Sequence, residues 1–197
     1  MYTTTTLLKS YLGFTTSETA DDSLLVTLIN AAQASIDSYC KRSFEGTTAT
    51  RYYDWTALDS VGRLRLDDDL LSTSTGAIVI TNGDTGATVI TSTQYRFEPY
   101  NTVSKRLVRL LSGSTGSGWQ FGTDGRISVA GSWGFTTAAP NDIVHATNRL
   151  AAYFYRQKDA QVFDVTAMPG MGEMIIPKGM PADVVKLLKP YRCLVMV

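Results

Sequence analysis

The chain has 197 residues, enough for one domain of ordinary size or for one domain with a substantial insertion. Hydrophobic residues make up 44%, as in a globular protein, whereas charged residues make up only 18%, below the usual share of about a quarter. The 18 basic and 18 acidic residues cancel, which argues against a protein that binds nucleic acid tightly. No apolar run approaches the roughly 18 residues of a membrane span, and no charged leader is present, so we expect a soluble protein that is intracellular when made.

Residues 1–46 are predicted to form helices. Thr19 and Asp22 provide a capping-box-like start, and Lys41 and Arg42 suit the negative end of the helix dipole. Between these ends, apolar residues recur at spacings of three and four, which places them on one face of a helix. This face consists of Leu25, Leu28, Ile29, Ala32, Ile36, Tyr39 and Cys40.

Residues 47–135 have the composition of strands. They are rich in threonine, glycine and β-branched residues, and several stretches alternate apolar with polar residues. Asn82 and Gly83 lie between two similar strand segments and are a strong signal for a β-hairpin. We therefore predict an α+β fold, in which the N- and C-terminal helices form a small helical bundle and residues 47–135 are an inserted β-rich lobe.

Residues 136–197 are predicted to complete the bundle. Pro140 and Asp142 favour the start of a long helix. An irregular segment with several glycines and prolines follows, and then a short helix from Pro181 that must end at Pro190. The apolar stripe of the long helix is Ile143, Thr147, Leu150, Ala151 and Phe154, and its other side carries His145, Asn148, Arg149 and Arg156.

No combination of residues indicates catalysis. His145 is the only histidine, so paired-histidine metal sites are excluded, and a Ser-His-Asp triad could be built only on this residue. We interpret His145 as a solvated or interface histidine. Cys40 and Cys193 lack CxxC spacing and are expected to be reduced thiols. We expect no catalytic residue, no metal and no cofactor.

Three features that could bind a ligand have plainer interpretations. The acids of Asp67–Asp69 could bind a hard cation, but the ligand spacing and distal glutamate of a calcium loop are missing, so a solvated turn is predicted. Residues 112–118 are rich in glycine but lack the Lys-Ser/Thr ending of a phosphate loop, which predicts a flexible loop. The tryptophans have no basic setting for stacking on bases, and core or interface anchors are predicted at Trp55, Trp119 and Trp133.

Four segments, taken in order, carry a family resemblance. They are DDSLLVTLINAAQASIDSYCKRSF near the N-terminus, VAGSWGF at the end of the β-rich segment, PNDIVHATNRLAAYFYRQKDA, and PADVVKLLKPYR near the C-terminus. In this order they resemble the head-tail connector, or adaptor, family of tailed bacteriophages. The resemblance covers both helical ends, about half of the chain, whereas the long middle segment departs from the smaller members of the family.

The resemblance implies a structural virion protein, made in the host cytoplasm and located in the neck. Such proteins form a ring, usually dodecameric, beneath the portal, extend the DNA channel and provide the tail attachment site. The implied partners are the portal protein and tail or neck proteins such as a tail terminator or stopper. Double-stranded DNA would pass through without specific binding, which the balanced charge suits, because each phosphate contact adds salt-dependent affinity.

The alternative is a β-rich carbohydrate-binding or enzymatic domain flanked by helices. It depends on the tryptophans and tyrosines of the β-rich segment, which could stack on a sugar.

The C-terminal region carries large apolar residues where chain ends are normally polar. Leaving them in water would forfeit roughly 1.5 to 3 kcal/mol for each large side chain. Either the tail folds back onto its own subunit, or it docks on a partner through adaptable methionine contacts and an extended end. The predicted docking residues are Met168, Met171, Met174, Ile175, Ile176, Met180, Leu194, Val195, Met196 and Val197.

Overall fold

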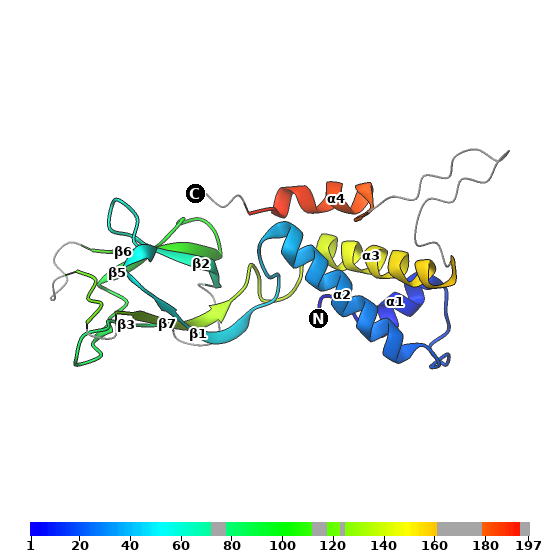
Figure 1. Cartoon of the computed structure of the whole chain (residues 1–197), viewed down its shortest axis with the longest axis horizontal. Helices are drawn as coiled ribbons and strands as arrows, with labels where there is room; N and C mark the ends of the chain where they lie inside the picture. The colour runs from blue at the N-terminus through cyan, green and yellow to red at the C-terminus, as the bar shows by residue number, and fades with distance from the viewer. Residues whose placement is uncertain (72–77, 112–117, 123–124, 161–178, 194–197) are drawn as a thin grey trace. The chain divides into compact units, whose positions relative to one another are not determined.

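The computed structural model describes residues 1–71, 78–111, 118–122, 125–160 and 179–193 (Figure 1). The chain divides into two compact units. The helical unit comprises Met1–Lys41 and Ala139–Val197, and the β unit comprises Arg42–Ala138.

The helical unit is organised around its longest helix. Helix α3 (Asn141–Ala160) contacts α1 (Thr5–Leu12), α2 (Asp22–Cys40) and α4 (Ala182–Leu188). A 3-10 turn at Lys189–Tyr191 follows α4 directly. The two long helices α2 and α3 pack against each other.

Helix α1 has clear signals at both ends. The Thr4 side chain accepts a hydrogen bond from the backbone N–H of Leu7, which satisfies one of the free donors at the start of the helix. Gly13 ends the helix with a φ of 82°, a left-handed conformation that glycine adopts without a steric penalty.

The N-terminal end of α2 differs from the predicted cap. The helix begins at Asp22 with Asp21 as the preceding residue, and the Asp21 side chain does not cap it. The Asp21 carboxylate instead accepts hydrogen bonds from the Tyr155 hydroxyl and the Lys158 ammonium of α3. This acid therefore ties two helices together.

The predicted apolar faces of the long helices form the core of the helical unit. Helix α2 buries Leu25, Ile29, Ala32, Ile36 and Cys40. On α3, Asn148 is also buried, and its side-chain oxygen accepts a hydrogen bond of 2.7 Å from the Thr3 hydroxyl. The prediction that Asn148 lies on the exposed side is wrong, because its amide has a polar partner within the core.

Seven strands form a single antiparallel sheet among the described residues of the β unit. Its hydrogen-bonded order is β4-β3-β7-β2-β6-β5, and β1 pairs with β7 outside this path. A 3-10 turn at Trp55–Ala57 follows β1. The strands are β1 (Thr47–Tyr53), β2 (Leu64–Leu71), β3 (Val79–Thr81), β4 (Val89–Ile90), β5 (Tyr95–Glu98), β6 (Ser104–Leu110) and β7 (Ile127–Trp133).

Strand β7 joins the sheet together. It pairs with β1 along its whole length, with β3 through Ser128 to Ala130, and with β2 at Trp133. Its burial alternates strictly, so the side chains of Ile127, Val129 and Trp133 point into the core. The sheet curls into a nearly closed barrel, with β2, β5 and β6 in one wall and β1, β3 and β7 in the other (Figure 1).

The inside of this barrel is a hydrophobic core to which all seven strands contribute. Its buried members are Tyr53, Leu64, Leu66, Leu70, Ile80, Ile90, Tyr95, Val108, Ile127, Val129 and Trp133. Gly134 follows β7 with a φ of 158°, and a Cβ atom there would lie 2.5 Å from the Glu45 carbonyl oxygen. Only glycine allows the backbone to approach this closely.

The predicted fold class is wrong. We predicted a helical bundle as the body of the protein and a β-rich lobe inserted in it, whereas the structure is dominated by the nearly closed, antiparallel sheet with helices at the ends of the chain. The reason is that β7 pairs with strands from three separate segments, which gives the sheet a hydrophobic core of its own. The predicted hairpin is confirmed, since Ile80 pairs with Ile90 across β3 and β4.

Candidate functional site

The exposed side of α3 gathers arginine and aromatic side chains. His145 and Arg149 are both exposed, on the side opposite the buried stripe. Tyr11 of α1 lies against them: its hydroxyl accepts a hydrogen bond of 3.4 Å from Arg149 Nη1, and its ring meets His145 edge-on at 6.1 Å between centroids. We call Tyr11, His145, Arg149, Tyr153 and Arg156 the α3 surface.

Two open hollows flank Arg149. The larger, of about 560 Å³, lies between α3 and α4 and is lined by Asp142, His145, Arg149, Asp183, Lys186, Leu187 and Pro190. The smaller, of about 350 Å³, is lined by Tyr11, Arg149, Ala152, Tyr153, Arg156 and Pro181. Arg149 lines both hollows, so the α3 surface is one continuous region.

Two of the four charged side chains around the larger hollow, Arg149 and Asp183, pair with each other, and Asp142 accepts a hydrogen bond. Arg149 forms an ion pair with Asp183, and the Tyr191 hydroxyl donates a hydrogen bond of 3.1 Å to Asp142. In the described part of the chain, no hydroxyl or thiol is hydrogen-bonded to His145, as a nucleophile activated by a histidine base would be. Tyrosine and arginine are the residue types that dominate protein–protein contacts, so this surface is suited to binding a protein partner.

The three acids Asp67–Asp69 lie within strand β2, so the predicted solvated turn is wrong. Arg51 of β1 forms ion pairs with Asp67 at 2.9 Å and with Asp68 at 3.0 Å. Asp69 is only 1% exposed and forms ion pairs with Arg106 and Arg42. The arginines that neutralise these acids are distant in sequence from β2, which is why the sequence pattern alone suggested solvent.

The stability of the β unit depends on pH through the carboxyl group of Asp67. Partial burial acts to raise the pKa of Asp67, but hydrogen bonds from Tyr53 and Arg51 outweigh this effect and hold the pKa below its ordinary value. The folded state therefore binds fewer protons than the unfolded state near this pKa. The stabilisation is complete above the unfolded pKa of about 3.9 and is lost as the pH falls through the lower, folded pKa.

We expect acid to destabilise the β unit less in Asp67→Asn than in the wild type. The difference should stay below about 1 kcal/mol, because Asp67 is largely exposed and water screens the ion pair. The measurement is urea denaturation followed by tryptophan fluorescence, at several pH values between neutral and about 3. Glu18→Gln, which removes an exposed acid from the helical unit, is the control. Identical pH profiles for Asp67→Asn and the wild type would contradict the expectation.

The tryptophans do not form one binding site. Trp133 is buried at 2% exposure, and Arg51 lies over its ring at 4.4 Å. Trp119 Nε1 donates a hydrogen bond of 2.9 Å to the Gly62 carbonyl oxygen. Trp55 is 71% exposed. Trp133 is thus a core residue, one of the two settings predicted for the tryptophans. The Trp55 side chain is instead exposed on the surface.

Most of the predicted docking residues lie outside the described residues. The exception is Met180, which is half-buried just before α4. The glycine-rich stretch 112–118 is described only at its last residue, Gly118, which is exposed. The docking assignment therefore stays a prediction.

The described residues offer neither a cluster of metal ligands nor a helix suited to crossing a membrane. No group of three or more histidine, cysteine or acidic side chains in the described ranges could hold a metal ion. None of the described helices combines the length and the apolar character that a membrane crossing requires.

Comparison with known proteins gives matches in structure alone. No protein-family model matches this sequence, and no curated protein matches it. A chain in a structure of the neck of an empty GTA particle, computed with C6 symmetry, is 18% identical with a TM-score of 0.64, and the match covers 97% of this chain and 89% of that one.

Two further structures give the same result. A chain from the neck of a native GTA particle, computed with C12 symmetry, has a TM-score of 0.56 over 89% of this chain and 85% of that one, at 18% identity. A chain from the virion of a native gene transfer agent (GTA) particle has a TM-score of 0.57 over 97% and 89%, also at 18% identity. This chain therefore shares its fold, over nearly its whole length, with chains of gene transfer agent particles.

Proposed function

We propose that this chain is a structural protein of the neck of a phage-like particle, and specifically a head-tail connector (adaptor). In this role it forms a dodecameric ring beneath the portal protein and extends the DNA channel. The ring provides the attachment site for tail or neck proteins such as a terminator or stopper. It is made in the host cytoplasm and incorporated into the virion, and it has no enzymatic activity.

The observation that carries the proposal is the extent of the likeness to a chain of a neck structure. The match covers 97% of this chain and 89% of that one, so both the helical unit and the β unit take part in it. A likeness confined to the β unit would have supported only a common barrel. The order of the four sequence segments, which resembles the connector family, supports the same role independently.

In this proposal the α3 surface contacts the portal or a neighbouring copy in the ring. Its tyrosines and arginines surround two open hollows, which a partner's side chains could fill. The predicted docking residues, from Met168 to Met180 and from Leu194 to Val197, would add apolar contacts to the same partners.

The test is electron microscopy of the purified chain with the portal protein of the same particle. We expect the chain alone to be monomeric or to associate only at high concentration, and to form rings on the portal when the two are mixed. Arg156→Glu, a charge reversal on the α3 surface, should reduce ring formation at least tenfold. Lys41→Glu, an equal charge reversal at an exposed residue after α2, should not.

Two results would contradict the proposal. One is a tight dimer that persists at nanomolar concentration and ignores the portal. The other is ring formation that is equally weakened by Arg156→Glu and Lys41→Glu, which would remove the α3 surface from the assignment. We do not propose the carbohydrate-binding or enzymatic alternative, because the three tryptophans on which it depended lie in three different settings.

A further inference from the structure

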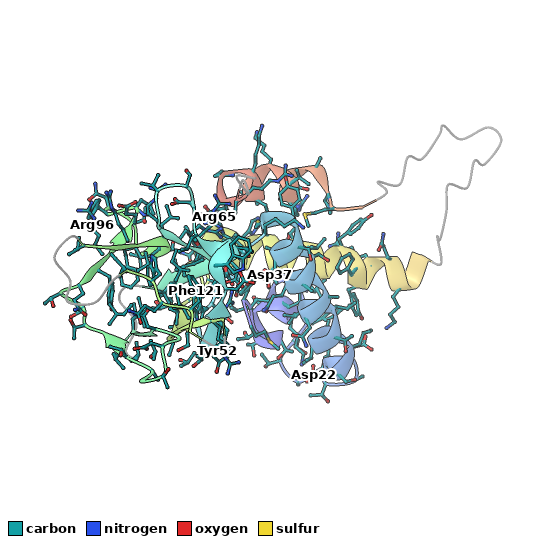
Figure 2. The ribbon with its side chains drawn as sticks, turned by 60° about the vertical axis from the view of Figure 1, so that its left-hand side comes forward. Asp22, Asp37, Tyr52, Arg65, Arg96 and Phe121 are labelled. Carbon is teal, nitrogen blue, oxygen red and sulfur yellow. The ribbon has the colours of Figure 1, made fainter. Side chains whose placement is uncertain are left out.

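The two cysteines of the chain lie next to each other in the helical unit, although they are 153 positions apart in the sequence. Cys40 is the last residue of α2, and Cys193 follows the 3-10 turn after α4. The backbone N–H of Cys193 donates a hydrogen bond of 2.8 Å to the Cys40 carbonyl oxygen. Figure 2 shows α2 rising from Asp22 past Asp37, with its C-terminal end beneath α4, which it contacts.

This backbone hydrogen bond sets the separation of the two cysteines. With standard bond lengths, an N–H···O bond holds the Cα atoms of its two residues about 4 to 6 Å apart. Disulfides in proteins span Cα separations of about 4.4 to 6.8 Å, and residues more than about 7 Å apart cannot be bridged without backbone movement. The backbone therefore already holds Cys40 and Cys193 at a distance that a disulfide bond can span.

The Cys40 side chain points toward the segment that carries Cys193. Cys40 Sγ donates a weak hydrogen bond to the Leu188 carbonyl oxygen, 3.9 Å away, so the thiol faces the end of α4. The Arg192 guanidinium lies 5.7 Å from the centre of the Tyr39 ring, a second contact between this segment and α2. Cys40 is fully buried and Cys193 is half-buried. Solvent therefore reaches the pair through Cys193.

We infer that Cys40 and Cys193 are a redox-responsive pair. The structure holds both as thiols, and a small-molecule disulfide converts them into an intrachain disulfide bond. The pairing rests on the geometry of the helical unit and does not depend on the proposed neck function. That function supplies a setting, because a virion protein leaves the reducing cytoplasm when the particle is released, and disulfides form and persist in oxidising surroundings.

The bond forms by two thiol–disulfide exchanges. The accessible Cys193 thiol loses its proton to solvent and attacks one sulfur of the oxidant, whose S–S bond breaks. A mixed disulfide forms on Cys193, and one small thiolate leaves and takes up a proton. The Cys40 thiol then loses its proton, and its sulfur attacks the Cys193 sulfur and expels the second small thiolate. The two cysteines together give up two electrons, which reduce one small-molecule disulfide to two thiols.

The disulfide ties the C-terminal end of α2 to the residue that precedes the predicted docking residues Leu194 to Val197. A cross-link stabilises the folded chain chiefly because it restricts the unfolded chain, and the effect grows with the length of the closed loop. The loop between Cys40 and Cys193 is long. We therefore expect oxidation to raise the midpoint of thermal unfolding of the helical unit by roughly 5 to 15 °C.

The experiment incubates the purified full chain with oxidised glutathione, and a parallel sample with a reductant. After oxidation, we expect a thiol assay in denaturant to find no thiol and the intact mass to fall by two hydrogen atoms. Trypsin cleaves after lysine and arginine, so a non-reduced digest should contain residues 10–41 linked to residues 193–197. Thermal unfolding is followed by far-ultraviolet circular dichroism, because the described α-helices all lie in the helical unit.

The matched variant is Cys193→Ser, which removes the accessible thiol and leaves the buried Cys40 in place. Its unfolding midpoint should not respond to the oxidant and should stay close to that of the reduced wild type. The inference is overturned if the oxidised wild type keeps both thiols, if it carries only mixed disulfides with glutathione, or if the cysteines link two chains into a dimer on a non-reducing gel. A linked chain that unfolds at no higher temperature than Cys193→Ser would overturn it as well. The portal takes no part in these measurements, so the inference can fail while the proposed neck function stands.

Discussion

Replacing Asp69 with alanine is expected to lower the free energy of unfolding of the β unit by about 3 to 5 kcal/mol, the cost of breaking a buried ion pair by removing one partner. The Asp69 side chain is 1% exposed. Its carboxylate accepts hydrogen bonds from Arg106 Nε at 2.8 Å and from Arg106 Nη2 at 3.3 Å, and it lies 3.4 Å from Arg42 Nε. Without Asp69, two guanidinium groups would remain in a largely dry environment with their main negative partner removed.

The measurement is guanidinium chloride denaturation followed by tryptophan fluorescence. All three tryptophans lie in the β unit, so their fluorescence reports on that unit. Asp54→Asn, which alters an exposed carboxylate of the same unit, should cost about 1 kcal/mol or less. Adding Arg106→Leu to Asp69→Ala should recover part of the loss, because it removes one of the two guanidinium groups that have lost the Asp69 carboxylate. A cost below about 1 kcal/mol for Asp69→Ala, with no recovery in the double variant, would contradict this account.

Trp133→Ala should destabilise the β unit by a similar amount, about 3 to 5 kcal/mol. Trp133 is among the largest fully enclosed side chains of the described core and ends the central strand β7. Its Nε1 donates a hydrogen bond of 2.9 Å to the Ala49 carbonyl oxygen of β1, and the Arg51 guanidinium lies 4.4 Å from the centre of its ring. Alanine would leave a cavity, an unused acceptor on β1 and an arginine without its aromatic support.

The matched control is Trp55→Ala, which deletes the same side chain where it is 71% exposed and should change stability by about 0.5 kcal/mol or less. Both variants retain two tryptophans as reporters, so their denaturation curves can be compared directly. Equal effects of the two substitutions would show that Trp133 does not hold β1 and β7 together as described.

Periodicity predicted the helices well and the candidate site in part. The spacing of Leu25, Ile29, Ala32 and Ile36 predicted the buried face of α2, because a helix that packs on one side must repeat apolar residues every 3.6 positions. The same rule placed His145 and Arg149 on the exposed side of α3. It did not place Tyr11 beside them, since that contact joins α1 to α3 through the fold.

The register of β2, β6 and β5 could not have been recognised in the sequence. Arg65, Arg96 and Arg109 are 13 to 44 positions apart. They share one side of the sheet because β2, β6 and β5 are neighbours in it, and because the register sets Arg96 opposite Arg109. A register shifted by one residue would have turned the Arg109 side chain to the opposite side of the sheet from Arg96.

The sequence by itself indicated the helical segments and the β-rich character of the middle of the chain, and it showed that His145 has no second histidine to act with, because these properties depend on local spacing and composition. The tertiary structure decided which element dominates the fold and which charges are buried. Strand β7 pairs with three other strands and closes the sheet around its own core, and Asp69 leaves solvent only because Arg42 and Arg106 meet it there. Such pairings join residues far apart along the chain, and local patterns carry no information about their partners.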